Sequence, residues 1–346
     1  MDLRKGFAMT SDIRMNDRRF FHSFPRPKKG EPEGSTLERG LAALDLMKKV
    51  GPILAPEIVN WDISGFSLGA KQLGILQRRM SFTELATSEL PEHSKVFGPI
   101  SLAFDLAALR AAGAIPVIYV PQGVVDSPLS LIATFCVHGI HHTKGVLSQL
   151  QQLKETADPV QLGQRLNMPV DPNCELQLKN RDSGGNIVAE YKIRLTDVQH
   201  VLQYIGFNNI PFDHSAGILG YFLDIFYPTD NTYKGDQLGY YRQREWRLIV
   251  TNINVRGRPI GRKLSASEVT ELEKVDLEFW SRKLSVDGVD QKRSELALVY
   301  DPTPSWNLFD VVEEVLVPAD AVDRARAIVG NSVSVGPAAA EQSSAI

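Results

Sequence analysis

The densest group of side chains that could do chemistry lies in one segment, YYRQREWRLIV, residues 240–250. It combines two tyrosines, three arginines and a tryptophan with a single carboxylate, Glu245. If this segment is an extended strand, Glu245 and Arg247 point to one face, whereas Arg244 and Trp246 point to the other. Cations beside a carboxylate favour its charged form, so we expect Glu245 to stay ionised.

Two roles for this carboxylate are open. In the first, Glu245 forms a salt bridge at the edge of a sheet and is structural. In the second, it accepts a hydrogen bond from a ribose hydroxyl of a bound ligand. The surrounding charge adds a further hypothesis, because residues 242–263 contain seven basic residues and one acidic residue. Such a stretch either contacts phosphates, including those of a nucleic-acid backbone, or forms a solvated hairpin.

Two earlier segments could complete a ligand site around Glu245. The run FFHSF places His22 among phenylalanines, and QRRMSFTEL contributes Arg78, Arg79 and Thr83. Each has a structural alternative. His22 could be a strand histidine satisfied by hydrogen bonds, and the two arginines could be a solvated charge pair.

The sequence gives little sign of metal or phosphate-loop chemistry. HGIHH places His138 and His142 four residues apart on one face of a helix, a spacing that metal ligands use. The segment lacks the glutamate of the HExxH motif, so polar packing is the alternative and we expect no metal. The P-loop, the GxGxxG dinucleotide loop and the GxSxG nucleophile elbow are all absent.

The composition describes an ordinary globular protein. The chain has 346 residues, 38 Lys+Arg against 41 Asp+Glu, and a net charge of −3, which argues against binding nucleic acid by bulk charge. Two cysteines, Cys136 and Cys174, exclude a disulfide scaffold; a single bridge between them is one alternative, and a reduced pair is the one we expect. The longest apolar segment, residues 217–228, is too short to span a bilayer and contains Asp224. Without a signal-peptide pattern, we expect a cytoplasmic protein without membrane contact.

Periodicity and turn residues indicate the elements that must position these side chains. A helix is predicted from Ser35 to Gly51, opened by a capping box and marked by one apolar stripe. Residues 100–120 predict a strand, a short helix and a second strand, which implies a sheet of mixed type. A helical stretch over residues 127–155 should be interrupted near Gly139. The segment SELALVYDP is predicted as a strand.

Three regions follow from this pattern. Residues 1–34 are predicted as an irregular N-terminal arm that contains the first strand, at FFHSFP. Residues 35–330 form one α+β domain with an insertion at about 147–200. That insertion includes a β-hairpin around DSGG, residues 174–194, which we suspect of contacting a partner. Residues 331–346 are predicted to be a disordered tail.

Several phrases occur in an order that resembles one family. FFHSFPRP, LERGLAALDLMKKVGPILAPE, RRMSFTELATSELPEHSKVFGPISLAFD, IPVIYVP, YYRQREWRLI and VEEVLVP are similar to the AbiGi-type family of bacterial phage-defence proteins, which act by abortive infection. The resemblance covers roughly residues 20–130 and 238–330. It implies an antitoxin-like binding partner for a nucleotidyltransferase-like toxin or a phage component.

More distantly, the layout resembles DarT-type ADP-ribosyltransferases. That resemblance implies a mixed, mostly antiparallel split sheet with flanking helices, and NAD as the substrate. His22 would hold the nicotinamide ribose, Arg79 or Arg78 would bind a phosphate, and Glu245 would be the catalytic carboxylate. The sequence departs from the pattern at Ser23, which follows His22, and at the REWR context of the glutamate. The implied NAD-binding set comprises His22, Ser23, Arg78, Arg79, Thr83, Tyr241, Arg244 and Arg247.

Three hypotheses follow for the function. The first is an NAD-consuming transferase of phage defence, in which Glu245 stabilises positive charge at the ribose as nicotinamide leaves. The second is a non-catalytic antitoxin or binding partner on the same fold. The third is a nucleic-acid binder that uses residues 242–263.

Overall fold

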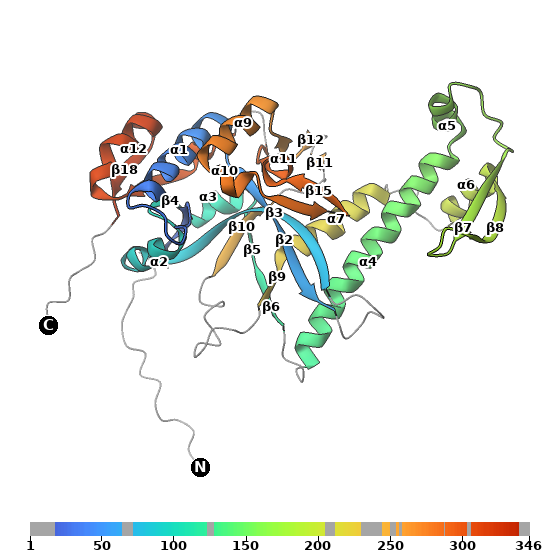
Figure 1. Cartoon of the computed structure of the whole chain (residues 1–346), viewed down its shortest axis with the longest axis horizontal. Coiled ribbons are helices and arrows are strands. Elements are labelled where there is room, and N and C mark those ends of the chain that lie inside the picture. The colour runs from blue at the N-terminus through green and yellow to red at the C-terminus, as the bar shows by residue number, and fades with distance from the viewer. Residues whose placement is uncertain are drawn as a thin grey trace, which may run out of the picture.

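A computed structural model describes residues 18–63, 72–122, 128–204, 212–229, 244–249, 254–255, 258–286, 288–302 and 306–338. Tyr241 and residues 1–17 lie outside this range. Figure 1 shows a large sheet covered by helices, and one long helix that leads away from it to a small separate lobe. The structure is therefore α+β with a mixed sheet and flanking helices, as the sequence predicted.

The main sheet is mostly antiparallel. Its path runs β13-β16-β2-β3-β1-β4-β17-β18, with β10 paired to β3 and β5 paired to β10. The pairing of β17 with β18 is parallel, and the other pairings in this sheet are antiparallel. Its strands are β1 (Arg18–Phe24), β2 (Ile53–Asp62), β3 (Gln72–Ala86), β4 (Ile100–Phe104), β5 (Ile115–Pro116), β10 (Glu245–Ile249), β13 (Arg262–Lys263), β16 (Leu298–Val299), β17 (Val312–Val317) and β18 (Ser334–Pro337).

The sheet divides at β3, which is long enough to pair with three strands. One of its edges pairs with β2 along its first half, down to Arg79, and with β1 along its second half, from Thr83 onward. The opposite edge pairs with β10 between the same two residues. The predicted first strand is confirmed, but it lies in the middle of the sheet and not in an irregular arm, because β1 sits between β3 and β4.

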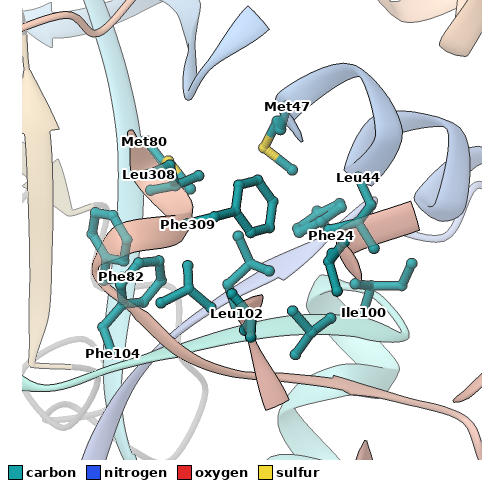
Figure 2. Close-up of a cluster of buried hydrophobic side chains, with 14 of the residues drawn as sticks. Phe24, Leu44, Met47, Met80, Phe82, Ile100, Leu102, Phe104, Leu308 and Phe309 are labelled. Atoms are coloured by element: carbon teal, nitrogen blue, oxygen red, sulfur yellow. The ribbon is translucent and has the colours of Figure 1, made fainter. Parts of the chain in front are cut away.

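One face of this sheet carries the main hydrophobic core. The core includes Phe82 and Leu102 from the sheet and Leu44 from the first helix, α1, whose apolar stripe was predicted from its period. Figure 2 shows these side chains packed together with aromatic residues from later in the chain. We call this side of the sheet the core face. The helices and 3-10 turns around the core are α1 (Ser35–Val50), α3 (Leu106–Ala111), η3 (Leu308–Asp310), η4 (Ala319–Ala321), α12 (Val322–Val329) and η5 (Gly330–Ser332).

The other face of the sheet, the network face, is covered by the long helix α4 (Pro128–Ala157) and by α7 (Phe212–Ile225). Trp61 and Ile75 of the sheet pack there against Val137 of α4 and Leu223 of α7. A small parallel pair, β6 (Ile118–Pro121) with β9 (Phe226–Thr229), lies beside them and supplies two tyrosines. This face therefore combines an apolar half with the polar side chains described below.

A small lobe extends from the far end of α4 (Figure 1). Its hydrophobic centre joins Leu147 of α4 and Phe212 of α7 to residues of the lobe itself. We call residues 158–204 the distal lobe, and they correspond to most of the insertion predicted at 147–200. Its elements are α5 (Pro159–Leu166), the hairpin β7 (Glu175–Arg181) with β8 (Ile187–Arg194), and α6 (Leu195–Tyr204).

The remaining elements lie around the main sheet. They are η2 (Thr87–Glu89), α2 (Leu90–Phe97), the pair β11 (Asn254–Val255) with β12 (Arg258–Pro259), α9 (Ala266–Val275), α10 (Leu277–Trp280), the hairpin β14 (Lys283–Val286) with β15 (Val289–Lys292), and α11 (Arg293–Leu296). Among the described residues, no helix combines the length and apolar character needed to cross a bilayer.

Three local predictions are wrong. The helix α4 runs without interruption through Gly139, because a single glycine costs a helix only about 1 kcal/mol and neighbouring contacts outweigh it. The predicted disordered tail contains β18, which hydrogen-bonds to β17 at the sheet edge. The predicted strand SELALVYDP begins as a helical turn, and only Leu298 and Val299 form a strand.

Candidate functional site

Glu245 is the first residue of β10, and its side chain lies on the network face with that of Arg247. Arg247 Nε donates a hydrogen bond of 2.8 Å to Glu245 Oε1. Tyr119 donates one of 2.6 Å to the other carboxylate oxygen, Oε2. Arg247 is 1% exposed and Glu245 is 13% exposed, so the pair is held away from bulk water. The face assignment made from the strand period is confirmed, because Trp246 packs against the core on the other side.

A glutamine extends this pair into a network. Gln77 Oε1 accepts hydrogen bonds from Arg247, at 3.3 Å, and from Arg79, at 2.8 Å. Arg79 forms a salt bridge with Glu57 on the adjacent strand β2. The Gln77 amide donates to the backbone carbonyls of Leu223 and Phe226, where α7 ends. We call Glu57, Gln77, Arg79, Glu245 and Arg247 the charged network.

Two tyrosines cover the charged network. The guanidinium carbons of Arg79 and Arg247 lie 4.9 Å and 4.7 Å from the centre of the Tyr227 ring, within the range of cation–π attraction. Tyr119 packs edge-on against Tyr227, with ring centres 6.3 Å apart. The planar rings therefore occupy space beside the guanidinium groups that a ligand would need.

The network keeps Glu245 ionised. Burial alone would raise the pKa of Glu245, but the Arg247 guanidinium and hydrogen bonds from Arg247, Ser81 and Tyr119 outweigh burial and hold that pKa below its usual range. Burial and the Glu245 carboxylate together raise the pKa of Tyr119, which therefore stays protonated as a donor. Both carboxylate oxygens are thus engaged within the protein, which is the arrangement expected of a structural ion pair.

A second carboxylate, Asp224 of α7, lies close to the same cations. Burial raises the pKa of Asp224 to about 7, while Lys144, Arg78, Arg247 and Arg79 act in the opposite direction. Within the described residues, Asp224 has no hydrogen bond or ion pair of its own. This half-buried carboxylate therefore changes charge near neutral pH, and sequence reasoning noted it only as a break in an apolar segment.

His22, expected to share a site with Glu245, lies on the opposite face of the sheet. The backbone register aligns Phe21, Thr83 and Glu245 across three strands, so their side chains share the network face and His22 points the other way. The His22 ring stacks on Phe24, 5.3 Å between centres, within the core face. Burial lowers its pKa to about 4, so it is neutral, and its Nδ1 donates to the Ser81 carbonyl at 2.8 Å.

Two further predicted residues are engaged elsewhere. Ser23 shares hydrogen bonds with Ser101, at 2.8 Å, and with His93, at 3.2 Å. Arg78 donates to the Leu296 carbonyl at 2.6 Å, on the side of the sheet away from Arg79. Thr83 alone lies directly opposite Glu245 in β3. The structure thus groups Arg79, Thr83 and Arg247 with Glu245 and separates His22, Ser23 and Arg78 from them.

The basic segment 242–263 is partly compensated. Arg244 forms a salt bridge of 2.6 Å with Glu84, and Arg262 forms one of 2.8 Å with Glu268. With Arg247 also paired, three of its described arginines have acidic partners. The described part of this segment therefore does not present a row of unpaired cations.

The histidine and cysteine candidates stay apart as well. Within the described residues, no three histidine, cysteine or acidic side chains come together as a metal site would require, and His138 and His142 lie on α4 without a third ligand. Cys136 and Cys174 are both free, one on α4 and the other in the distal lobe.

The distal lobe carries the largest concentration of exposed apolar side chains. Of the nineteen exposed large apolar residues in the described chain, nine lie within its residues. They come from both of its helices, from the loop after α5 and from both strands of its hairpin. These residues are Val160, Leu166, Met168, Leu178, Ile187, Val188, Tyr191, Val201 and Tyr204.

Comparisons with protein-family models, with curated proteins and with solved structures find no match to this chain.

Proposed function

We propose that this chain is a binding protein that docks a protein partner through the distal lobe. The observation that carries the proposal is the concentration of exposed apolar side chains on that lobe. Contiguous exposed apolar surface on a soluble protein is typical of an interaction site. The hairpin over residues 174–194, suspected from the sequence as a partner contact, provides part of this surface.

The apolar face of the hairpin extends past the part that packs into the hydrophobic centre of the lobe. Leu176 and Ile193 pair across the strands and pack into the hydrophobic centre of the lobe. The next pair on the same face, Leu178 with Tyr191, is exposed. Because side chains two residues apart share a face, the buried strip continues directly into the exposed one. A partner that covered Leu178 and Tyr191 would extend an existing core.

The charges of the lobe favour apolar recognition. Residues 158–204 contain six acidic and five basic side chains, so the lobe has almost no net charge. Its ion pairs are local and exposed, for example Arg194 with Asp197 at 2.9 Å. The resemblance to the AbiGi-type family suggests a nucleotidyltransferase-like toxin as the partner, in a phage-defence pair.

The ADP-ribosyltransferase interpretation has less support from the geometry. Both oxygens of Glu245 are engaged by Arg247 and Tyr119, and His22 faces the opposite side of the sheet. We assign Glu245 a structural role. Nicotinamide release from NAD by the full chain, abolished by Glu245→Gln, would contradict that assignment.

A matched pair of leucine variants tests the docking surface. Leu178 of β7 is 43% exposed and Leu106 of α3 is 37% exposed, so Leu178→Asp and Leu106→Asp introduce the same charge at similar exposure. The full chain should co-purify with a nucleotidyltransferase-like protein encoded beside it. Leu178→Asp should abolish that complex, while Leu106→Asp should preserve it. A complex that survives Leu178→Asp and Tyr191→Asp together would overturn the assignment of the lobe as the docking surface.

A further inference from the structure

An open pocket of 920 Å³ is lined by residues that belong neither to the charged network nor to the distal lobe. Its walls are the loop that follows β1, the short helix α10 and the base of the hairpin β14–β15. Several charged side chains and one aromatic ring, Phe279, line it. No sequence motif marked this region, because its parts are about 250 residues apart in the chain.

The acidic side chains around this pocket are already paired. Glu31 accepts two hydrogen bonds from Arg39, at 2.7 Å and 2.8 Å. Lys28 contacts Asp276 at 2.6 Å and Glu278 at 2.9 Å. The hydrogen bonds from Arg39 hold the pKa of Glu31 well below its usual range. These carboxylates therefore have their own cations and are not available to the remaining basic residues.

Three basic side chains of the pocket form no salt bridge within the described residues. Within the described residues, Lys29, Arg282 and Arg293 form no salt bridge, and their side chains make no hydrogen bond. Arg293 is only 9% exposed, and its Nε is buried without a hydrogen-bond partner. Its guanidinium lies 4.1 Å from the centre of the Phe279 ring. An unpaired buried guanidinium is costly, which suggests that something else supplies the missing negative charge.

A backbone hydrogen bond places Arg282 and Arg293 next to each other. The Arg293 N–H donates to the Arg282 carbonyl at 2.9 Å and closes the base of the hairpin, so the two residues face each other across it. Burial lowers the pKa of Arg293 and the Arg282 charge lowers it further, and together they outweigh the Glu57 carboxylate, which acts in the opposite direction. Like charges placed opposite each other destabilise a hairpin unless an anion lies between them.

We infer that Lys29, Arg282 and Arg293, which we call the arginine pocket, bind the phosphate of a ligand about the size of a mononucleotide. Guanidinium groups match phosphate oxygens with paired hydrogen bonds, and a lysine adds a third positive charge. The volume suits a small organic ligand and exceeds what inorganic phosphate needs. Phe279 gives the non-phosphate part of the ligand an apolar wall.

Calorimetric titration of the full chain with AMP, inorganic phosphate and adenosine tests this assignment. AMP should bind, phosphate should bind more weakly, and adenosine should not bind. Arg282→Gln and Arg293→Gln should each weaken AMP binding by about 10- to 100-fold, because each removes charge-assisted hydrogen bonds. Arg326→Gln, at an exposed arginine of α12, is the matched control and should have no effect.

The outcomes separate the alternatives. Arg282 is exposed, so Arg282→Gln keeps the test decisive if Arg293→Gln does not fold. Failure of AMP and phosphate to bind at millimolar concentration would overturn the proposal, as would equal weakening by Arg282→Gln and Arg326→Gln. Preference for an oligonucleotide over AMP would overturn the assignment to a small ligand. AMP binding should persist in Leu178→Asp, so this result is independent of the docking surface.

Discussion

The charged network and the arginine pocket both gather arginines, but they differ in how the charge is balanced. In the network, Arg247 and Arg79 have carboxylate partners and share a glutamine. In the pocket, Arg293 is almost as buried, yet among the described residues it forms no salt bridge, and its Nε has no hydrogen-bond partner. Clustered arginines alone therefore do not identify a binding site. The informative feature is a buried cation whose counter-charge the protein does not provide.

The largest effect should follow from breaking the balanced pair. Arg247→Met leaves the Glu245 carboxylate buried without its cation, and we expect a loss of about 3–5 kcal/mol in the free energy of unfolding. Urea unfolding measures this change. Arg324→Met, which breaks the exposed pair with Glu38, should leave stability nearly unchanged. A loss below about 1 kcal/mol for Arg247→Met would mean that the network contributes little to the fold.

A variant at Asp224 should have the opposite effect and increase the free energy of unfolding. Burial raises the pKa of Asp224 to about 7, so the folded state holds a proton that the unfolded state has lost. Its contribution to stability therefore falls as pH rises from the usual carboxyl range to about 7. Asp224→Asn should be more stable than the wild type by about 3 kcal/mol at pH 8.

The pH dependence is the control for this variant. The advantage of Asp224→Asn should fall by half or more between pH 8 and pH 5 in parallel urea titrations, because the wild-type carboxyl of the folded state becomes protonated over that range and no longer carries a buried charge. A constant difference across that range would show that packing, and not the charge of Asp224, explains the effect.

A smaller loss is expected from Tyr119→Phe. This variant removes one donor to Glu245 while Arg247 and Ser81 remain, and it keeps the ring contact with Tyr227. A hydrogen bond to a charged group contributes about 1.5–3 kcal/mol, and we expect the lower end of that range in unfolding experiments. In the double variant with Arg247→Met, the two losses should not add, because both act on one carboxylate.

The smallest effect should occur in the arginine pocket. Arg293→Met removes a cation that lacks a carboxylate partner and keeps an apolar stem beside Phe279, so stability should change by less than about 1 kcal/mol, or rise. AMP at ten times its dissociation constant should stabilise the wild type by about 1.4 kcal/mol and should not stabilise Arg293→Met. A loss of stability as large as that of Arg247→Met would mean that Arg293 contributes as much to the fold as Arg247 does.

Local pattern predicted the elements but only part of the site. The period of two placed Glu245 and Arg247 on one face of β10, and the capping pattern placed α1, because both depend on neighbouring residues. The face of His22 depends on how β1 aligns with β3, a long-range choice that the strand itself does not reveal. The same strand pairing that separates His22 from Glu245 places Thr83 opposite Glu245.

The arginine pocket could not have been predicted from the sequence. Whether Arg293 lacks a partner depends on which carboxylates Arg39 and Lys28 take, and Asp276 reaches both across more than two hundred residues. The segment around Arg293 also resembled a strand, whereas it folds as a helical turn that closes a hairpin. Charge balance is a property of the whole tertiary structure, so a count of acidic and basic residues cannot locate an imbalance.

The length of α4 has a mechanical consequence. Thirty residues of α-helix span about 45 Å, so this helix acts as a lever with the distal lobe at its tip. A tilt of about 5° at the sheet would displace the tip by about 4 Å, given the same rise per residue. Val137 of α4 and Leu223 of α7, which pack against the sheet, therefore help to set the direction of α4 and with it the position of the lobe.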